Sequence, residues 1–415
     1  MDRGSGRGRR TLLAVVCAVA VSTIYAAQPV LERMGTDLGL SAGGLGWVVG
    51  VGQLGYLAGL ILLVPLGDLL DRRRLMACHL TLAALGTGLV AVTEQPAVAL
   101  IGLAVAGVFA VVVQIAVAYA AATSAAPERG RDIGVVTSGV VIGILGGRVL
   151  AGLLADLAGW RGIYLTLTIL SLALAAAVLA VLPPDARRSP RDRDGRRGGA
   201  RRYARAIGTV GRLTATDRLF RGRALIAFFL FASFGTLWSG IALPLSAERW
   251  QLSTTQIGLF GLAGLAGALG AARAGRWADR GRSGSVTGWS LAVLIASWGL
   301  TALTGHSLWS LGAGIVLLDF AVQAVHVTSQ QLITAARPDR ASGTIGAYMV
   351  FYSLGSGLGA VTTTWAYDAA GWAAASVLGA GYATAALVIW ALHRRPHGDI
   401  GTGELTATEN TMTTP

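Results

Sequence analysis

Four polar residues share one face of a single apolar segment, residues 307–335. Asp319 is followed by Gln323, His326 and Gln330 at spacings of four, seven and eleven residues, which a helix brings onto one side. A carboxylate in the middle of a membrane-length segment is costly to bury and commonly marks an ion or substrate pathway. An imidazole exchanges protons near neutral pH. This face is therefore our first candidate site for proton coupling or substrate binding.

A basic residue lies at similar depth in another apolar segment. Of the 34 basic residues, all of them arginine, only Arg148 is placed near the middle of such a segment, residues 133–157. A structural ion pair between Arg148 and Asp319 is the plain alternative to a role in coupling. The two interpretations are compatible if the pair breaks during transport.

Other polar and aromatic residues could line a cavity between helices. They could bind a polar substrate, and equally they could bond or pack one helix against another. The candidates are Tyr25, Gln28, Gln53, Tyr56, Trp238, Tyr348 and Tyr352.

The composition excludes a soluble protein. The 415 residues are 53% hydrophobic and 13% charged, and the mean hydropathy is +0.61. The formal net charge of +13 does not indicate nucleic-acid binding, because the arginines lie in short loops between apolar segments. Phosphate-binding loops, metal-spaced Cys/His clusters and nucleophile elbows are missing, so we expect no enzyme, cofactor or metal.

The apolar segments predict an all-α membrane protein with twelve spans, because lipid offers no partner to unpaired backbone. The first segment resembles a cleaved signal, but it is long enough to span. The predicted spans are 11–31, 43–66, 75–93, 97–123, 133–157, 161–182, 224–246, 255–274, 284–304, 307–335, 344–366 and 372–392.

The spans group into two bundles of six helices. The predicted order is a tail (1–10), the N-terminal bundle (11–182), an Arg-rich linker (183–223), the C-terminal bundle (224–393) and a disordered polar tail (394–415). Short motifs repeat about 210 residues apart and indicate a duplicated half, as in secondary transporters. The repeats are 67–72 with 275–280, 127–129 with 338–340, and 156–160 with 368–372.

The arginines predict the orientation. With both termini in the cytoplasm, 30 of the 34 arginines fall in cytoplasmic segments and three in outside loops. We therefore expect a multi-pass protein of the cell membrane with cytoplasmic termini. The linker alone holds thirteen arginines and is expected to lie against the anionic leaflet.

The turn at residues 67–74 resembles the loop signature of the major facilitator superfamily, and residues 275–282 resemble its weaker second copy. Three further stretches, 25–29, 65–68 and 146–152, resemble the arabinose-efflux-permease and drug–proton antiporter branch. The region 139–152 lacks the Gly-Pro pair of the antiporter signature, since Arg148 follows Gly147.

The resemblance implies a 6 + 6 fold in which this loop latches the bundles in the outward-facing state. Simple anchoring of the arginines at the membrane surface is the alternative. The residues of this motif are Gly67, Asp68, Asp71, Arg72 and Arg74 in the first copy, and Gly275, Asp279 and Arg280 in the second. Arg74 departs from the family pattern, which usually has glycine at this position.

We therefore expect a monomeric secondary transporter that exports a small organic molecule or drug against proton entry by alternating access. Its partners would be the substrate, protons and the lipid bilayer, with the proton gradient as driving force and no nucleic acid. A proton-coupled uptake symporter for a sugar or other metabolite is the alternative within the same class. A membrane receptor without transport activity is the alternative from another class.

The orientation can be tested with single cysteines in a cysteine-free background. Cysteines at Gly195 and Ala341 should react with a membrane-impermeant thiol reagent only after cells are opened, whereas one at Thr36 should react in intact cells. Labelling of Gly195→Cys in intact cells would show that the orientation is opposite to the predicted one.

Overall fold

The structure is a computed structural model of the whole chain, and it describes residues 3–68, 70–124, 128–184, 208, 211–277, 283–337 and 341–393. The described residues form helices and turns, with no strand among them. The first half contains α1 (Arg3–Tyr25), η1 (Gln28–Val30), α2 (Leu31–Asp37), α3 (Ala42–Leu62), η2 (Val64–Asp68), α4 (Arg72–Val92), α5 (Pro96–Phe109), α6 (Val112–Thr123) and α7 (Arg129–Val181).

The second half repeats this pattern. It contains α9 (Arg218–Gly240), α10 (Ala242–Ser246), α11 (Thr254–Trp277), α12 (Ser283–Thr301), η5 (Ala302–Gly305), α13 (Leu308–Ala335) and α14 (Ala341–His393). Helix α9 begins six residues before the predicted span 224–246, inside the segment predicted as linker.

Side-chain caps define where several helices begin. Asp71 accepts a hydrogen bond from the backbone N–H of Arg74, and Asp217 accepts one from the backbone N–H of Phe220. Ser41 and Ser307 cap α3 and α13 in the same way. Each cap satisfies one N–H that has no partner inside the helix.

The spans predicted from the sequence are present as apolar helices. Nine helical stretches of the described chain are long and apolar enough to cross a membrane, and Thr254–Gly270 is a shorter one. Two of the nine, in α7 and α14, are 51 residues long and contain two spans each. The chain is therefore a multi-pass membrane protein with the predicted twelve-span organisation.

Two predicted spans are interrupted. Helix α1 ends at Tyr25, and the chain continues through η1 and α2, because Pro29 has no N–H to donate to a continuing helix. The predicted span 97–123 is divided into α5 and α6 by a turn at Ala110 and Val111.

The two long helices are each bent sharply at a glycine. Gly159 in α7 has φ 69° and ψ 172°, and Gly371 in α14 has φ 66° and ψ −162°. This backbone region is essentially restricted to glycine. The two positions are equivalent in the repeat 156–160 and 368–372, so each half contains the same hairpin between its fifth and sixth spans.

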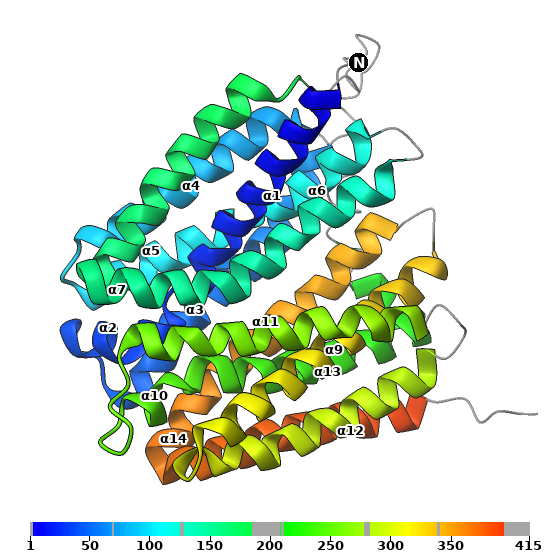
Figure 1. The fold of residues 1–415 in the computed structure, drawn as a ribbon. Helices are drawn as coiled ribbons and strands as arrows, with labels where there is room; N and C mark the ends of the chain where they lie inside the picture. Colours follow the sequence, from blue (N-terminus) through cyan, green and yellow to red (C-terminus); the bar gives the residue numbers. More distant parts are fainter. Residues whose placement is uncertain are drawn as a thin grey trace, which may run out of the picture.

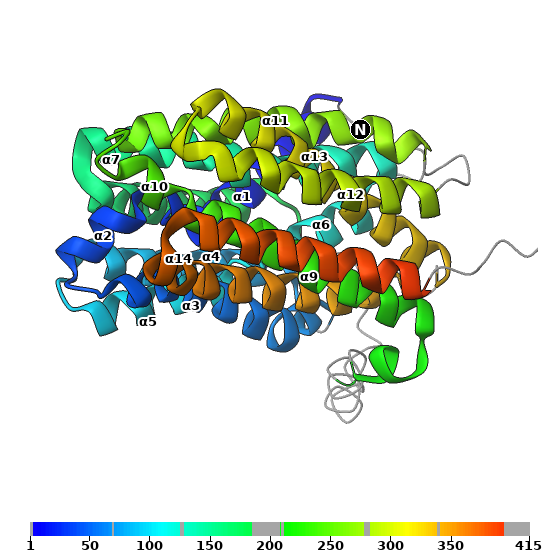
Figure 2. The same ribbon diagram turned by 90° about the horizontal axis from the view of Figure 1, so that it is seen from below.

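The two halves form two bundles (Figure 1). They lie close together at the end that carries α2 and α10 and spread apart toward the end where the chain begins (Figure 1). In the second half, α12 and the last part of α14 lie on the side turned away from the first half (Figures 1 and 2). The centre of the molecule therefore lies between helices of the two halves, and α11 packs against α7 there.

Replacing Gly371 with alanine should lower the free energy of unfolding by about 1–3 kcal/mol, because a Cβ is strained at this backbone geometry. Thermal unfolding of the purified protein in detergent measures the change. Gly299→Ala is the matched control, because Gly299 lies inside α12 and a Cβ there meets nothing within 4 Å. Equal stability of the two variants would contradict the role of the glycine kink.

Candidate functional site

Arg148 lies at the centre of the molecule, on α7, and is 2% exposed. Its Nε donates to Oε1 of Gln28 at 2.8 Å, and its Nη1 donates to the carbonyl oxygen of Ile144 at 3.0 Å. Its Cζ lies 3.9 Å from the centre of the Trp238 ring, and Phe234 also faces it at 5.7 Å. Gln28 belongs to the first half and both aromatic rings to α9, so one guanidinium contacts both bundles.

Asp319 faces the same place from α13 and is 1% exposed. A Cβ added to Gly264 would lie 2.8 Å from Cζ2 of Trp238 and 3.1 Å from Oδ2 of Asp319, so carboxylate and indole meet across this glycine. Asp319 interacts electrostatically with Arg148. Among the described residues, no direct ion pair joins the two side chains.

Three polar atoms at this centre are buried and lack a well-formed hydrogen bond in the described chain, although Asp319 and the indole N–H of Trp238 attract each other. They are Nη2 of Arg148, Nε1 of Trp238 and Oδ2 of Asp319. An unpartnered buried polar atom costs about 1–3 kcal/mol, and more when the group is charged. The buried centre that holds these three atoms is therefore the strongest candidate for a place where a proton or a substrate binds.

Hydrogen bonds between the two halves surround this centre. The hydroxyl groups of Tyr25 and Tyr352 bond to each other. Gln28 Nε2 donates to Oγ of Ser239 at 3.4 Å. Ser353 Oγ donates to the backbone oxygen of Gln53 at 2.7 Å. The predicted cavity residues Tyr25, Gln28 and Tyr352 thus meet at the interface of the bundles.

His326 belongs to a neighbouring cluster. Its Nδ1 lies 3.1 Å from the hydroxyl of Tyr348, and its Nε2 lies 3.2 Å from Nε2 of Gln330. Its ring is 5.1 Å from that of Phe231, which in turn lies 4.0 Å from the ring of Tyr352. The aromatic rings therefore connect His326 to the site of Arg148 and Asp319.

Within the described chain, the side chains of the remaining predicted cavity residues make no hydrogen bond to Arg148 or Asp319. Tyr56 accepts a hydrogen bond from Gln114 Nε2 at 3.2 Å, within the N-terminal bundle. Gln53 is 1% exposed and both polar atoms of its side chain lack partners among the described residues. Gln323 is half-buried on α13. Gln53 is therefore a further candidate for substrate contact.

Sequence reasoning missed several participants. Ser239, Ser353 and Gln114 each bond to a predicted cavity residue. Ser239 directly follows Trp238, and Ser353 directly follows Tyr352. Adjacency to a predicted site residue is the signal that could have identified these two serines.

The first copy of the loop motif surrounds the beginning of α4. Asp71 accepts from the N–H of Arg74 at 2.9 Å, and Arg72 is 6% exposed. Gly67 is buried in η2, which ends at Asp68. In the second copy, Gly275 lies in α11, whereas Asp279 and Arg280 lie outside the described residues.

A second carboxylate joins the bundles at the end that carries α2 and α10. Asp156, on α7, accepts a hydrogen bond from Thr254 Oγ1 at 2.5 Å and from the backbone N–H of Thr255 at 2.8 Å. Arg33 pairs with the same carboxylate at 3.1 Å. A carboxylate is stabilised at the beginning of a helix, here α11. This contact holds the two halves together at one end.

Close backbone approach supports the same contact. A Cβ on Gly152 would lie 2.3 Å from the backbone oxygen of Thr254, and one on Gly46 would lie 2.8 Å from that of Ala360. Only glycine fits at such distances. The bundles are therefore closed at this end of the molecule.

Comparison with known proteins supports one family. The model of the Major Facilitator Superfamily matches residues 11–245 and 223–413. The uncharacterized transporter YgaY of Escherichia coli O157:H7 is 38% identical over 380 residues, covering 91% of this chain and 94% of YgaY. The inner membrane transport protein YnfM of Escherichia coli K12 is 28% identical over 300 residues, covering 71% of this chain and 69% of YnfM.

A solved structure shares the fold. A bacterial homolog of the human lysosomal transporter Spinster, in an inward-facing and occupied conformation, superposes with a TM-score of 0.74 at 13% identity. The match covers 95% of this chain and 96% of that chain. At this identity the likeness concerns the fold alone.

Asp156→Asn should weaken the contact between the bundles at the α2 and α10 end. Charge-assisted hydrogen bonds contribute about 1.5–3 kcal/mol each, so the population that is open at this end should rise by about tenfold. Spin labels at Thr36 and Glu248 report the separation through distance measurements in detergent.

Asp37→Asn is the matched control. Asp37 accepts from Trp160 Nε1 at 2.7 Å and pairs with Arg161 at 3.5 Å, both in its own bundle. Its removal should leave the label distances unchanged. The same distances in Asp156→Asn and in the unmodified protein would show that Asp156 does not hold this end closed.

Proposed function

The chain belongs to the Major Facilitator Superfamily, and on that premise we propose that it exports a small organic molecule in exchange for protons across the cell membrane. Transport of the superfamily type requires two bundles that open in turn to either side of the membrane.

The observation that carries the proposal is the fully buried carboxylate of Asp319. It lies beside a buried guanidinium without a direct bond to it, and Oδ2 lacks a well-formed hydrogen bond among the described residues. A charged carboxylate in this environment is costly, and uptake of a proton removes that cost. A group that exchanges a proton at this depth can couple proton movement to the state of the bundles.

Arg148 would couple the proton to the position of the two halves. When Asp319 is charged, its field stabilises the guanidinium that Trp238 and Phe234 contact from the other bundle. When Asp319 takes up a proton, this compensation is lost and the contact between the halves weakens. Protonation would thereby favour one arrangement of the bundles over the other.

Substrate binding is assigned to the same centre. The unpartnered atoms of Gln53, Arg148 and Trp238 offer hydrogen-bond donors, and the rings of Phe231, Phe234 and Tyr352 offer apolar surface. A small organic molecule with polar and aromatic parts would find hydrogen-bond donors and apolar surface among these side chains. In the proposed orientation, with both termini in the cytoplasm, the closed end that carries α2 and α10 faces outward.

Asp319→Asn should abolish transport driven by a pH gradient, because asparagine mimics the protonated carboxyl group permanently. Substrate binding, and exchange that needs no net proton movement, should persist in part. Substrates are first identified by thermal shift against a panel of small organic molecules, and flux is then measured in reconstituted vesicles with pH gradients of each sign. Asp368→Asn, an exposed carboxylate, is the control and should retain gradient-driven flux.

The double variant Asp319→Asn/Arg148→Gln separates coupling from structural pairing. If Asp319 only neutralises Arg148, the single variant loses several kcal/mol of stability and the double variant regains both folding and flux. Recovery of gradient-driven flux would therefore refute proton coupling through Asp319. Accumulation of substrate on the side from which protons leave identifies export, whereas movement of both in one direction identifies the uptake symporter.

A further inference from the structure

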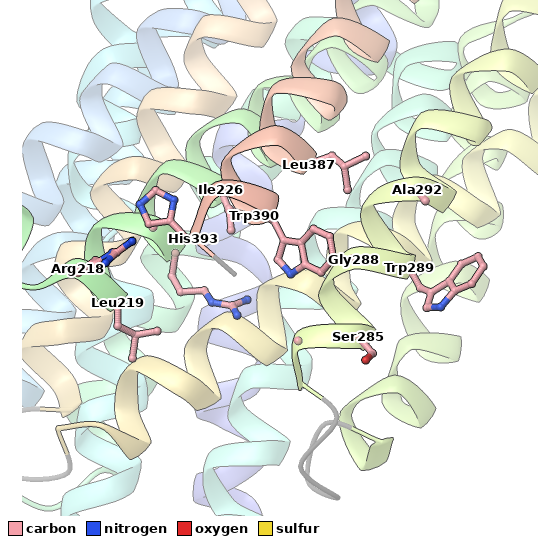
Figure 3. A pocket seen from close by; sticks show the side chains of 13 residues that line it. Arg218, Leu219, Ile226, Ser285, Gly288, Trp289, Ala292, Leu387, Trp390 and His393 are labelled. Carbon is pink, nitrogen blue, oxygen red and sulfur yellow. The ribbon is translucent and has the colours of Figure 1, made fainter. Parts of the chain in front are cut away.

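A groove with a volume of about 910 Å³ lies in the C-terminal bundle, away from the site of Arg148 and Asp319. Helices α9, α12 and α14 form it, and Figure 3 shows their side chains around it. Its lining includes Arg218, Arg223, Trp289, Leu387, Trp390 and His393.

The groove lies at the ends of three helices. Arg218 is the first residue of α9, Ser285 lies in the first turn of α12, and His393 is the last residue of α14. Since these helices span the membrane, their ends lie at the depth of the lipid headgroups. All three ends are on the side of the molecule opposite to α2 and α10 (Figure 1).

The groove faces lipid. Helix α12 and the last part of α14 lie on the side of the bundle turned away from the first half (Figure 2). Trp289 is 76% exposed on this side, and Leu219 is 40% exposed. Tryptophan is enriched where the hydrocarbon of a membrane meets the headgroups. The apolar wall of the groove is therefore suited to acyl chains.

Glycines shape the floor of the groove. A Cβ on Gly288 would collide with the indole of Trp390, and one on Gly222 would lie 2.9 Å from Cδ2 of His393. The two rings therefore sit against bare backbone of the neighbouring helices. This arrangement fixes Trp390 and His393 beside the groove.

The polar wall of the groove is positively charged. Arg223 donates one hydrogen bond, from Nη1 to Oγ1 of Thr287 at 2.9 Å, and the exposed Arg218 makes no hydrogen bond or ion pair with any described residue. The neighbouring Asp217 is already bound, to Arg337 at 2.8 Å and to the N–H of Phe220. No acidic side chain is among the described residues that line the groove.

We propose that this groove binds an anionic phospholipid of the adjacent leaflet, which is the cytoplasmic one in the proposed orientation. Arg218 and Arg223 contact the phosphate, and one acyl chain lies along Trp289 and Leu387. Basic pockets between membrane helices at this depth suit anionic headgroups. Guanidinium groups match the geometry of phosphate oxygens.

The proposal is tested by native mass spectrometry of the full chain in detergent. Phosphatidylglycerol, phosphatidylethanolamine and inorganic phosphate are titrated separately. The unmodified protein should retain phosphatidylglycerol in preference to phosphatidylethanolamine and should not retain phosphate. Arg218→Gln/Arg223→Gln should weaken phosphatidylglycerol binding by about tenfold, because each arginine near a membrane surface contributes measurably to anionic lipid binding.

Arg221→Gln is the matched control. It removes the same charge from the same part of α9, is exposed, and does not line the groove. Its binding of phosphatidylglycerol should equal that of the unmodified protein. Arg218→Gln alone leaves the bond between Arg223 and Thr287 intact, and a weakened binding in this folded variant excludes misfolding as the cause.

Three results would overturn the proposal. One is equal binding of the two phospholipids. Another is equal loss of binding in the double variant and in Arg221→Gln. The third is lipid binding that occurs only after residues 394–415 are removed, because this result would assign the groove to the chain's own tail.

Discussion

A positive charge buried away from water must obtain every stabilising contact from the protein, and Arg148 obtains its contacts from both halves. Gln28 supplies an acceptor from the N-terminal bundle, and Trp238 and Phe234 supply ring faces from the C-terminal bundle. Each such contact is worth about 1–3 kcal/mol when water is excluded. The relative position of the bundles at the centre therefore depends on how this one guanidinium is compensated.

Most of the fold could be predicted from the sequence because a membrane restricts the choices. The lengths of the apolar segments predict the membrane spans. The repeat of residues 156–160 in 368–372 predicts two equivalent hairpins, and the kinks at Gly159 and Gly371 confirm them. The interruptions were less predictable. The end of α1 depends on Pro29, whereas the turn at Ala110 carries no sequence signal of its own.

The candidate site could be predicted only in part. Arg148 and Asp319 were identifiable because charges within apolar segments are rare. The bonds of Tyr25 to Tyr352 and of Asp156 to Thr254 were not, because their partners are 327 and 98 residues apart and ordinary polar residues occur in many spans. The spacing of residues along one helix predicts which of them share a face. It does not predict which residue of the other bundle each of them contacts.

The stacking of Arg148 on Trp238 gives the chain an intrinsic optical label. The emission of an indole depends on the charge held above its ring and on the water that reaches it. Because the guanidinium and the indole come from different halves, the fluorescence of Trp238 should change whenever the halves part. The chain contains 11 tryptophans, so this signal is the difference between the protein and its Trp238→Phe variant. Movement of the bundles could thus be followed in real time without an attached dye.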